Sequence, residues 1–389
     1  MSMKSLQNIA LPFLCLNLIF SGQLLAEPAG IFSLGNALDN PNTKIDERLA
    51  NIRSYDFVSG FTLRVFWKDL ETSQGVYDFS VIDEAVKRVE AVGQHLNLEV
   101  LQGVPQYVID GAGSTYLNSR NEVTPVPWDS FAQSRFAALQ NAMANHVVDD
   151  GTGANLPLNQ QSVLVSVDAT PVGLNLGVRD LNNAIRNLPD YTQQRFIDSI
   201  VQGVGVSRSA FSNQQGFLTF FAFSDGQAGV PVDQQLITRL DGLYNGNGQP
   251  SLAFFIENLS DLGPVPLGVG SPGNNLLTWS GLGGDTMMQG LDSWLKHTPS
   301  RDSQLSSLNP ATGIELAYDT YGTRFFELYV TDLDGAMNGA LDATGQPILN
   351  DLTSWNTTLV AVPEPSAILS ILLMGVMALL PLRRQQRDH

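Results

Sequence analysis

Four charged residues lie inside stretches of the chain that are otherwise apolar. They are Arg64 in "TLRVFW", Glu99 in "LNLEVLQG", Glu257 near the end of "LAFFIEN" and Glu327 in "RFFELYVTD". An ionised carboxylate in apolar surroundings is costly unless it is paired or its pKa is raised. We therefore expect Arg64 to pair with one of the glutamates. The sequence leaves three roles open for this set: a structural ion pair, a catalytic carboxyl pair, or contacts to a sugar without catalysis.

The chemistry that suits such a carboxyl pair is glycoside hydrolysis. Two carboxyl groups on either side of a glycosidic bond act as an acid and as a nucleophile or base. We predict Glu257 or Asp168, at the end of "SVLVSVDA", as the acid, and Glu327 as the nucleophile or base. Arg64 and Glu99 would then contact the substrate. Aromatic rings near strand ends stack on the apolar face of a sugar, and the candidates are Trp67, Tyr107, Trp128 and Trp279.

No metal or cofactor is expected to take part in this chemistry. The only cysteine, Cys15, lies in the first apolar run, and the histidines are scattered at positions 95, 146, 297 and 389. This composition argues against thiolate or histidine metal sites and against a cysteine nucleophile. The sequence contains no phosphate-binding loop and no dinucleotide-binding motif. The formal net charge of -17 argues against nucleic acid as a partner.

Apolar runs that alternate with helical patterns must position these residues. The runs that predict strands are 31–35, 60–67, 96–103, 162–169, 216–224, 251–258, 275–281 and 324–332. Eight strands separated by helices favour parallel crossovers, and their nearly continuous apolarity fits strands that are covered on both faces. We predict an α/β fold of the (β/α)8 TIM-barrel type over residues 27–345, with a doubly wound open sheet as the alternative.

A recognisable motif follows the second predicted strand. It has the pattern W-x-x-L-E-x-x-x-G-x-Y-D-F-S-x-I-D and runs from Trp67 to Asp83. With its flanks, residues 60–105, it resembles the early part of clan-A glycoside hydrolases, notably the beta-galactosidase-like barrels. The resemblance implies a (β/α)8 barrel that handles carbohydrate. Within the motif, Glu71 and Asp83 are expected to be structural, because Gly75 permits the bend and Ser80 can begin the next helix.

The chain departs from that family at the two positions that carry its chemistry. Such barrels place the acid at the end of strand four, commonly as Asn-Glu, and the nucleophile at the end of strand seven. Here the predicted fourth strand has Asp168 as its only carboxylate. The predicted seventh strand, in "NLLTWSGLGGD", has no glutamate, and Asp285 comes late. A catalytically inactive carbohydrate-binding or surface protein is therefore the alternative function.

Both ends of the chain resemble sorting signals rather than parts of the fold. Residues 1–26 combine Lys4, an apolar stretch and a small residue, Ala26, at the expected cleavage site, as in a secretory signal peptide. Residues 362–389 begin with Val-Pro-Glu-Pro, continue with an uncharged run at 367–382, and end with arginines. Such a run is marginal for a membrane helix, and arginines favour the cytoplasmic side.

This C-terminal order resembles the PEP-CTERM sorting signal of Gram-negative bacteria. The resemblance implies recognition by an exosortase, passage through the inner membrane, and a final place in the cell envelope or outside the cell. Extracellular polysaccharide is then the expected carbohydrate partner. An ordinary single-span membrane anchor is the alternative. Residues 346–361 would connect the barrel to this signal as a closing helix or a tail.

Overall fold

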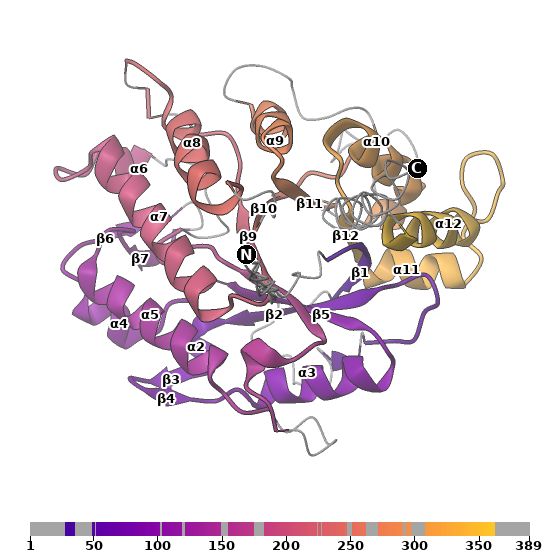
Figure 1. Ribbon diagram of the computed structural model, residues 1–389, viewed down its shortest axis with the longest axis horizontal. Helices are drawn as coiled ribbons and strands as arrows, with labels where there is room; N and C mark the ends of the chain where they lie inside the picture. Colours follow the sequence, from indigo (N-terminus) through magenta and orange to yellow (C-terminus); the bar gives the residue numbers. More distant parts are fainter. Residues whose placement is uncertain are drawn as a thin grey trace, which may run out of the picture.

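Eight parallel strands close into a barrel (Figure 1). The computed structural model describes residues 28–35, 49–50, 52–101, 103–118, 121–148, 155–174, 183–223, 225–226, 228–246, 251–261, 271–290, 293–296 and 308–361. The barrel strands are β1 (Gly30–Leu34), β2 (Gly60–Phe66), β5 (His95–Leu101), β8 (Leu164–Asp168), β9 (Gln215–Thr219), β10 (Leu252–Glu257), β11 (Asp285–Gln289) and β12 (Phe325–Tyr329). Because β12 pairs with β1, the predicted TIM barrel is confirmed and the open sheet is excluded.

Helices surround this barrel (Figure 1). The longer ones are α3 (Ser80–Ala91), α5 (Ser130–Ala144), α7 (Gln193–Ala210), α8 (Val232–Tyr244), α9 (Pro272–Gly281), α10 (Pro310–Tyr321), α11 (Val330–Met337) and α12 (Ile348–Ala361). Shorter elements are α2 (Trp67–Leu70), α4 (Gln106–Gly111), α6 (Asn183–Arg186), the 3-10 turns η1 (Leu158–Gln160) and η2 (Trp294–Lys296), and the two-stranded pairs β3 (Glu71–Ser73) with β4 (Val76–Tyr77) and β6 (Thr115–Leu117) with β7 (Val123–Pro125).

Local sequence signals explain where several helices begin and end. The Thr192 side chain caps α7 by accepting a hydrogen bond from the backbone N–H of Arg195. Asn309 caps α10, and Pro310 occupies its first turn. Gly322 ends the same helix in the left-handed conformation, with φ of 68°. These are the cap and stop residues that α-helices favour, so the ring of helices follows from the sequence.

The inside of the barrel has two chemically different parts. An apolar layer fills it with seven residues from six strands: Phe32, Val165, Phe217, Ala253, Phe255, Met287 and Phe325. Because all eight strands are parallel, the barrel has one end where the strands begin, here called the amino mouth. At the other end, the carboxyl mouth, the strands end and the interior becomes polar. The apolar layer therefore separates the two mouths.

The predicted seventh strand is wrong. Residues 275–281 belong to helix α9, which Ser271 caps, and the seventh strand is β11 with the sequence Asp-Thr-Met-Met-Gln. The apolar residues of 275–281 pack as the buried side of that helix, which includes Leu276 and Trp279. A short apolar run is compatible with a buried strand or a buried helix, and β11 carries polar residues at both ends. The eighth strand also stops earlier than expected, at Tyr329, where α11 follows.

The last described segment packs on the barrel. Residues 346–361, expected as a closing helix or tail, contain α12, whose Ile348, Leu352 and Leu359 are buried. Asn356 in this helix accepts a hydrogen bond from the backbone N–H of Ile31 in β1, at 2.8 Å. The predicted signal peptide, 1–26, and the predicted sorting signal, 362–389, lie outside the described residues. None of the helices within the described residues combines the length and the apolar character that crossing a bilayer requires.

Candidate functional site

Polar and charged side chains from six strands gather at the carboxyl mouth. This set is called the mouth cluster here and consists of Arg64 (β2), Glu99 (β5), Asp168 (β8), Glu257 (β10), Gln289 (β11), and Glu327 and Tyr329 (β12). Strand pairing brings several of them side by side, because Arg64 is in register with Glu99, and Gln289 is in register with both Glu257 and Glu327. The structure therefore assembles the four charged residues that the sequence singled out.

Arg64 is the centre of this cluster. Its Nε donates a hydrogen bond to Oε2 of Glu99, and its Nη2 donates to Oε1 of Gln289. The same Nη2 lies 3.4 Å from Oε2 of Glu327. The guanidinium is buried, so these contacts replace the water that a charged group would otherwise require. The expected pairing of Arg64 with a glutamate is confirmed, and it includes two of them.

Glu327 is a fully buried carboxyl group beside Arg64. Its Oε1 accepts hydrogen bonds from Thr62 Oγ1 at 2.7 Å and Asn97 Nδ2 at 2.9 Å. Burial and the neighbouring charge of Glu99 raise the pKa of Glu327 well above its usual value. Burial also raises the pKa of Glu99, and the charge and hydrogen bond of Arg64 offset this only in part. The surroundings of both carboxyl groups therefore disfavour their ionised forms, and Arg64 is the cation that opposes this effect.

Asp168 ends the fourth strand and titrates close to neutrality. Its side chain is 7% exposed, and its Oδ1 accepts a hydrogen bond from the backbone N–H of Thr170 at 2.8 Å. Burial, with a smaller contribution from the charge of Glu99, raises the pKa of Asp168 to about 7 against the opposing hydrogen bonds from Thr170. A carboxyl group with such a pKa can donate a proton at physiological pH.

Glu257 is the carboxylate of the cluster that is least buried. It ends β10 and is half-buried, whereas Glu99, Asp168 and Glu327 are buried. Its charge acts on the other members, because it contributes to raising the pKa values of Glu99 and Tyr329. Glu257 and Asp168 are thus the two carboxyl groups of the cluster with the most access to solvent, since Glu327 has none.

Sequence reasoning missed Gln289 and Tyr329. Gln289 ends the true seventh strand, and its Nε2 donates to the Tyr329 hydroxyl at 2.9 Å and to the Gly290 carbonyl at 3.0 Å. The apolar run 275–281 has the pattern of a buried strand, so the sequence predicts the seventh strand there and does not mark Gln289 as a strand end. The polar run "DTMMQG" before a glycine is the available signal for a strand that ends in a barrel mouth. The residue that ends strand seven is therefore an amide, which cannot replace a carboxylate as nucleophile or base.

The four aromatic candidates are not drawn together. Trp279 lies in α9 with no exposed surface, so its expected place at a strand end is wrong. Trp67 and Tyr107 lie beside Glu71 and Arg135, outside the barrel interior. Trp128 precedes α5 and donates to Asp190 Oδ2 at 2.9 Å. Among the described residues, no hydrogen bond or ring contact joins any of them to the mouth cluster.

Glu71, in the family-like motif, is the acceptor of a second buried network. It accepts hydrogen bonds from Trp67 Nε1 and from the backbone N–H of Gly75, both at 2.8 Å, and from Arg135 Nη2. Burial alone would raise the pKa of Glu71, but the hydrogen bonds from Gly75 and Trp67 hold it below its usual value. The expectation that Glu71 is structural fits these contacts, because they join the motif residues Trp67 and Gly75 to Arg135 of α5.

Replacing Glu71 with Gln is expected to destabilise the protein by about 2 kcal/mol at pH 7, because Arg135 loses its carboxylate and the turn loses its acceptor. A lowered carboxyl pKa stabilises the fold above the usual pKa, and this contribution is lost as the pH falls. The difference between the variant and the wild type should therefore shrink below pH 4 in urea unfolding. Glu84→Gln, which removes a half-exposed pair with Arg88 on α3, is the control and should change stability by less than about 0.5 kcal/mol. An equal effect of both substitutions would contradict this role of Glu71.

The described residues contain no group of three or more histidine, cysteine, aspartate or glutamate side chains placed to hold a metal ion.

The chain is similar in structure to the catalytic domain of beta-amylase from Paenibacillus polymyxa, with 11% sequence identity, a TM-score of 0.53, and coverage of 87% of this chain and 100% of that chain. A GH10 xylanase from Bispora sp. MEY-1 matches with 11% identity and a TM-score of 0.43, over 77% of this chain and 82% of that one. Xylanase XynB from Paenibacillus barcinonensis matches with 12% identity and a TM-score of 0.44, over 77% and 83%.

No protein-family model matches the chain, and no curated protein matches its sequence. At 11% identity, the similarity to the beta-amylase domain establishes the barrel fold, which this chain shares with a glycoside hydrolase. Function has to be argued from the mouth cluster, because one barrel fold supports many unrelated activities.

Proposed function

We propose that this protein is an exported barrel that hydrolyses the glycosidic bonds of an extracellular polysaccharide or glycoside. The observation that carries the proposal is the pair of carboxyl groups that end two strands at the carboxyl mouth: Asp168, which ends β8 and is 7% exposed, and Glu257, which ends β10 and is half-buried. In barrels of this class the ends of the strands supply catalytic residues. Glycoside hydrolysis needs one protonated and one ionised carboxyl group near the bond, and the raised pKa of Asp168 provides the first.

The roles follow from exposure and protonation. Asp168 is the general acid, which protonates the leaving oxygen, and Glu257 is the base or nucleophile. Glu327, expected from the sequence to be the nucleophile or base, is better suited to a positioning role, because it is fully buried and its pKa is raised well above the usual value. Arg64 and Glu99 line the base of the site. The proposed substrate is carbohydrate, and no cofactor or metal is required.

A second candidate function is carbohydrate binding without catalysis. The observation that favours it is Gln289, an amide at the end of the seventh strand, between Glu257 and Glu327 in the strand register. A neutral side chain there leaves the site one carboxylate short of the family pattern that the sequence resembles. A surface or matrix protein that retains the barrel and its polar mouth would have this composition.

We also propose that the chain is exported and sorted. The support for this comes from the sequence: a signal peptide at 1–26 with its cleavage position after Ala26, and a PEP-CTERM-like tail with an apolar run at 367–382 followed by arginines. An exosortase in the inner membrane would recognise the tail. The protein would then reach the envelope or the extracellular matrix, where polysaccharide is available.

The purified protein should be incubated with a panel of aryl glycosides and with native exopolysaccharide at pH 6 and pH 8. Hydrolysis is expected for one sugar class, with a higher rate at pH 6, because the acid form of Asp168 falls above pH 7. Binding by saturation-transfer NMR without any release of reducing ends would support the binding function instead. If no member of the panel is bound or hydrolysed, the carbohydrate proposal is wrong.

A further inference from the structure

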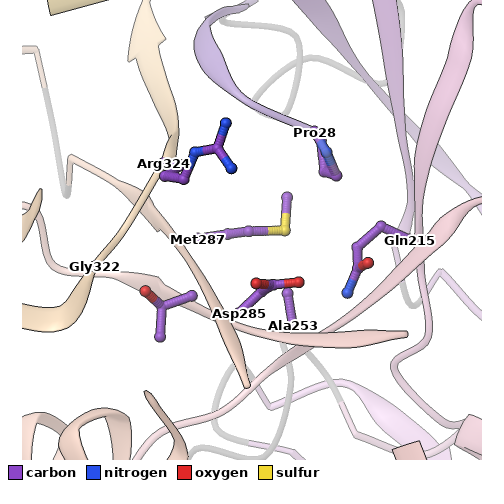
Figure 2. Close-up of a pocket in the computed structure, with 8 residues that line it drawn as sticks. Pro28, Gln215, Ala253, Asp285, Met287, Gly322 and Arg324 are labelled. Atoms are coloured by element: carbon purple, nitrogen blue, oxygen red, sulfur yellow. The ribbon is translucent and has the colours of Figure 1, made fainter. Parts of the chain in front are cut away.

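A hollow of about 690 Å³ opens at the amino mouth, opposite the mouth cluster. Its lining includes residues at or just before the starts of four strands: Ser59, His95, Ser162 and Arg324. Its inner wall is formed by Phe32 and Val165 of the apolar layer. A smaller cavity of about 20 Å³ lies beside it, and Figure 2 shows Pro28, Met287 and Arg324 around that cavity. Pro28 and Arg324 line both.

The two ends of the described chain meet at this hollow. Pro28, the first described residue, and Ala361, the last one, both belong to its lining. Pro28 follows the predicted signal-peptide cleavage site after Ala26 by two residues, and Ala361 directly precedes the predicted sorting signal at Val362. The cleavage site and the start of the sorting signal were predicted from separate sequence features. The structure places the residues next to both of them at the same mouth of the barrel, and neither prediction required this.

The connection between α12 and the apolar run at 367–382 is too short to allow the barrel to reverse its orientation relative to the bilayer. Five residues lie between Ala361 and Ala367, so these two residues are at most about 20 Å apart when the connection is fully extended. A domain of this size has a radius of gyration of about 20 Å, so its opposite ends lie roughly 40 Å or more apart. An inserted run therefore keeps the amino mouth near the bilayer.

The chemistry of the hollow also suits a lipid surface. None of the described residues that line it is aspartate or glutamate, although the chain has a net charge of -17. The lining includes Arg324, and Val360 is 56% exposed beside it. His95 also lines the hollow, but burial lowers its pKa and so disfavours its charged form. An anionic bilayer surface attracts basic groups and accepts apolar ones, whereas it repels carboxylates. The lining of this hollow can therefore approach such a surface, and the carboxylate of Asp285 belongs to the smaller cavity beside it.

We infer that, while the C-terminal tail is in a bilayer, the amino mouth faces the lipid surface and the mouth cluster faces away from it. This inference rests on the membrane segment of the proposed sorting tail, and it does not depend on whether the mouth cluster hydrolyses or only binds carbohydrate. The partner of the amino mouth is an anionic phospholipid surface. The consequence is that the carbohydrate site is presented to the side from which polysaccharide would arrive.

The test uses residues 27–389, the chain left after the proposed cleavage, which contains no cysteine. One variant adds Thr357→Cys, an exposed position on α12 that lines the hollow, and its matched control adds Lys68→Cys, an exposed position directly after β2 at the carboxyl mouth. Each is labelled with a thiol-reactive fluorophore and reconstituted into phosphatidylethanolamine–phosphatidylglycerol liposomes that carry a nitroxide on the lipid headgroup. The label at 357 is expected to lose most of its fluorescence, while the label at 68 keeps most of it.

Four other results would overturn the inference in distinguishable ways. Stronger quenching at position 68 would show a bound protein with the opposite orientation, and equal quenching would show a bound protein with no preferred orientation. In both cases the membrane segment would stand. A failure of both variants to associate with liposomes would remove the membrane segment, while the glycoside assay would still decide the proposed activity. The thiol introduced at position 357 could also resist labelling in detergent and become reactive when Val360→Asp is added. That result would show that the C-terminal tail itself occupies the hollow.

Discussion

The substitution Asp168→Asn is expected to reduce glycoside hydrolysis by a factor of about 10² to 10⁴, the usual contribution of general acid catalysis. Asparagine keeps the size of the side chain and can still accept from the backbone N–H of Thr170, but it has no acidic proton to give to a leaving group. The loss should be small for aryl glycosides with good leaving groups and large for natural polysaccharide. Rates measured with both substrates distinguish the loss of the general acid, which affects mainly the natural polysaccharide, from unfolding, which affects both substrates equally.

The same substitution should stabilise the protein at high pH. The pKa of Asp168 rises from 3.8 to about 7 on folding, so the folded state binds the proton more tightly than the unfolded state. Wild-type stability is then complete below pH 4 and falls as the pH rises to about 7, by a total of about 4 kcal/mol. The asparagine side chain does not titrate, so urea unfolding should show a gain for the variant at pH 8 that disappears at pH 4.

Asp110→Asn is the matched control, because Asp110 lies exposed in α4 and makes one hydrogen bond with Gln106. It should leave both the hydrolysis rate and the pH dependence of unfolding unchanged. A full rate in the Asp168→Asn variant would remove Asp168 from the proposed mechanism. A pH dependence of unfolding equal to that of the wild type would show that Asp168 is ionised in the folded protein.

The substitution Arg64→Met is expected to destabilise the protein by about 3 to 5 kcal/mol, the usual effect of removing one partner of a buried ion pair. Met fills much of the volume of the arginine, so the cost comes from charge rather than from a cavity. Glu99 would lose its main counter-charge, and Gln289 and Glu327 would each lose a donor. Unfolding in urea at pH 7, followed by circular dichroism, measures this change.

A second substitution separates charge from shape. Combining Arg64→Met with Glu99→Gln should recover a large part of the lost stability, because the uncompensated charge is removed with its partner. Arg64→Lys should fall between the wild type and Arg64→Met, since lysine keeps the charge but cannot contact Glu99, Gln289 and Glu327 at once. If Arg64→Met were as stable as the wild type, the cluster would not contain an ionised Glu99.

The architecture was largely predictable because it rests on repeated local signals. Apolar runs of strand length alternate with capped helices, and every predicted strand except the seventh overlaps a strand of the barrel. The pairing of Arg64 with glutamates was also predictable, because each of these charges interrupts an apolar run and has to be compensated inside the fold. The prediction of the seventh strand failed because β11 is polar at both ends, while the apolar face of α9 has the length and composition of a strand.

The details of the site required the three-dimensional arrangement. The hydrogen bonds that Glu327 accepts come from Thr62 and Asn97, which belong to two other strands. The raised pKa of Asp168 comes from the surroundings that the closed barrel creates, which no single segment reveals. The aromatic candidates were chosen from their places near predicted strand ends, and Trp279 shows that such placement depends on a correct strand assignment.

The layer of Phe32, Phe217, Phe255, Phe325 and their neighbours has one more consequence. This layer closes the interior of the barrel between the two mouths, so a long polymer cannot pass through the barrel. Under the proposed function, a glycan chain would lie across the rim or insert one terminus, and any released product would leave through the same opening.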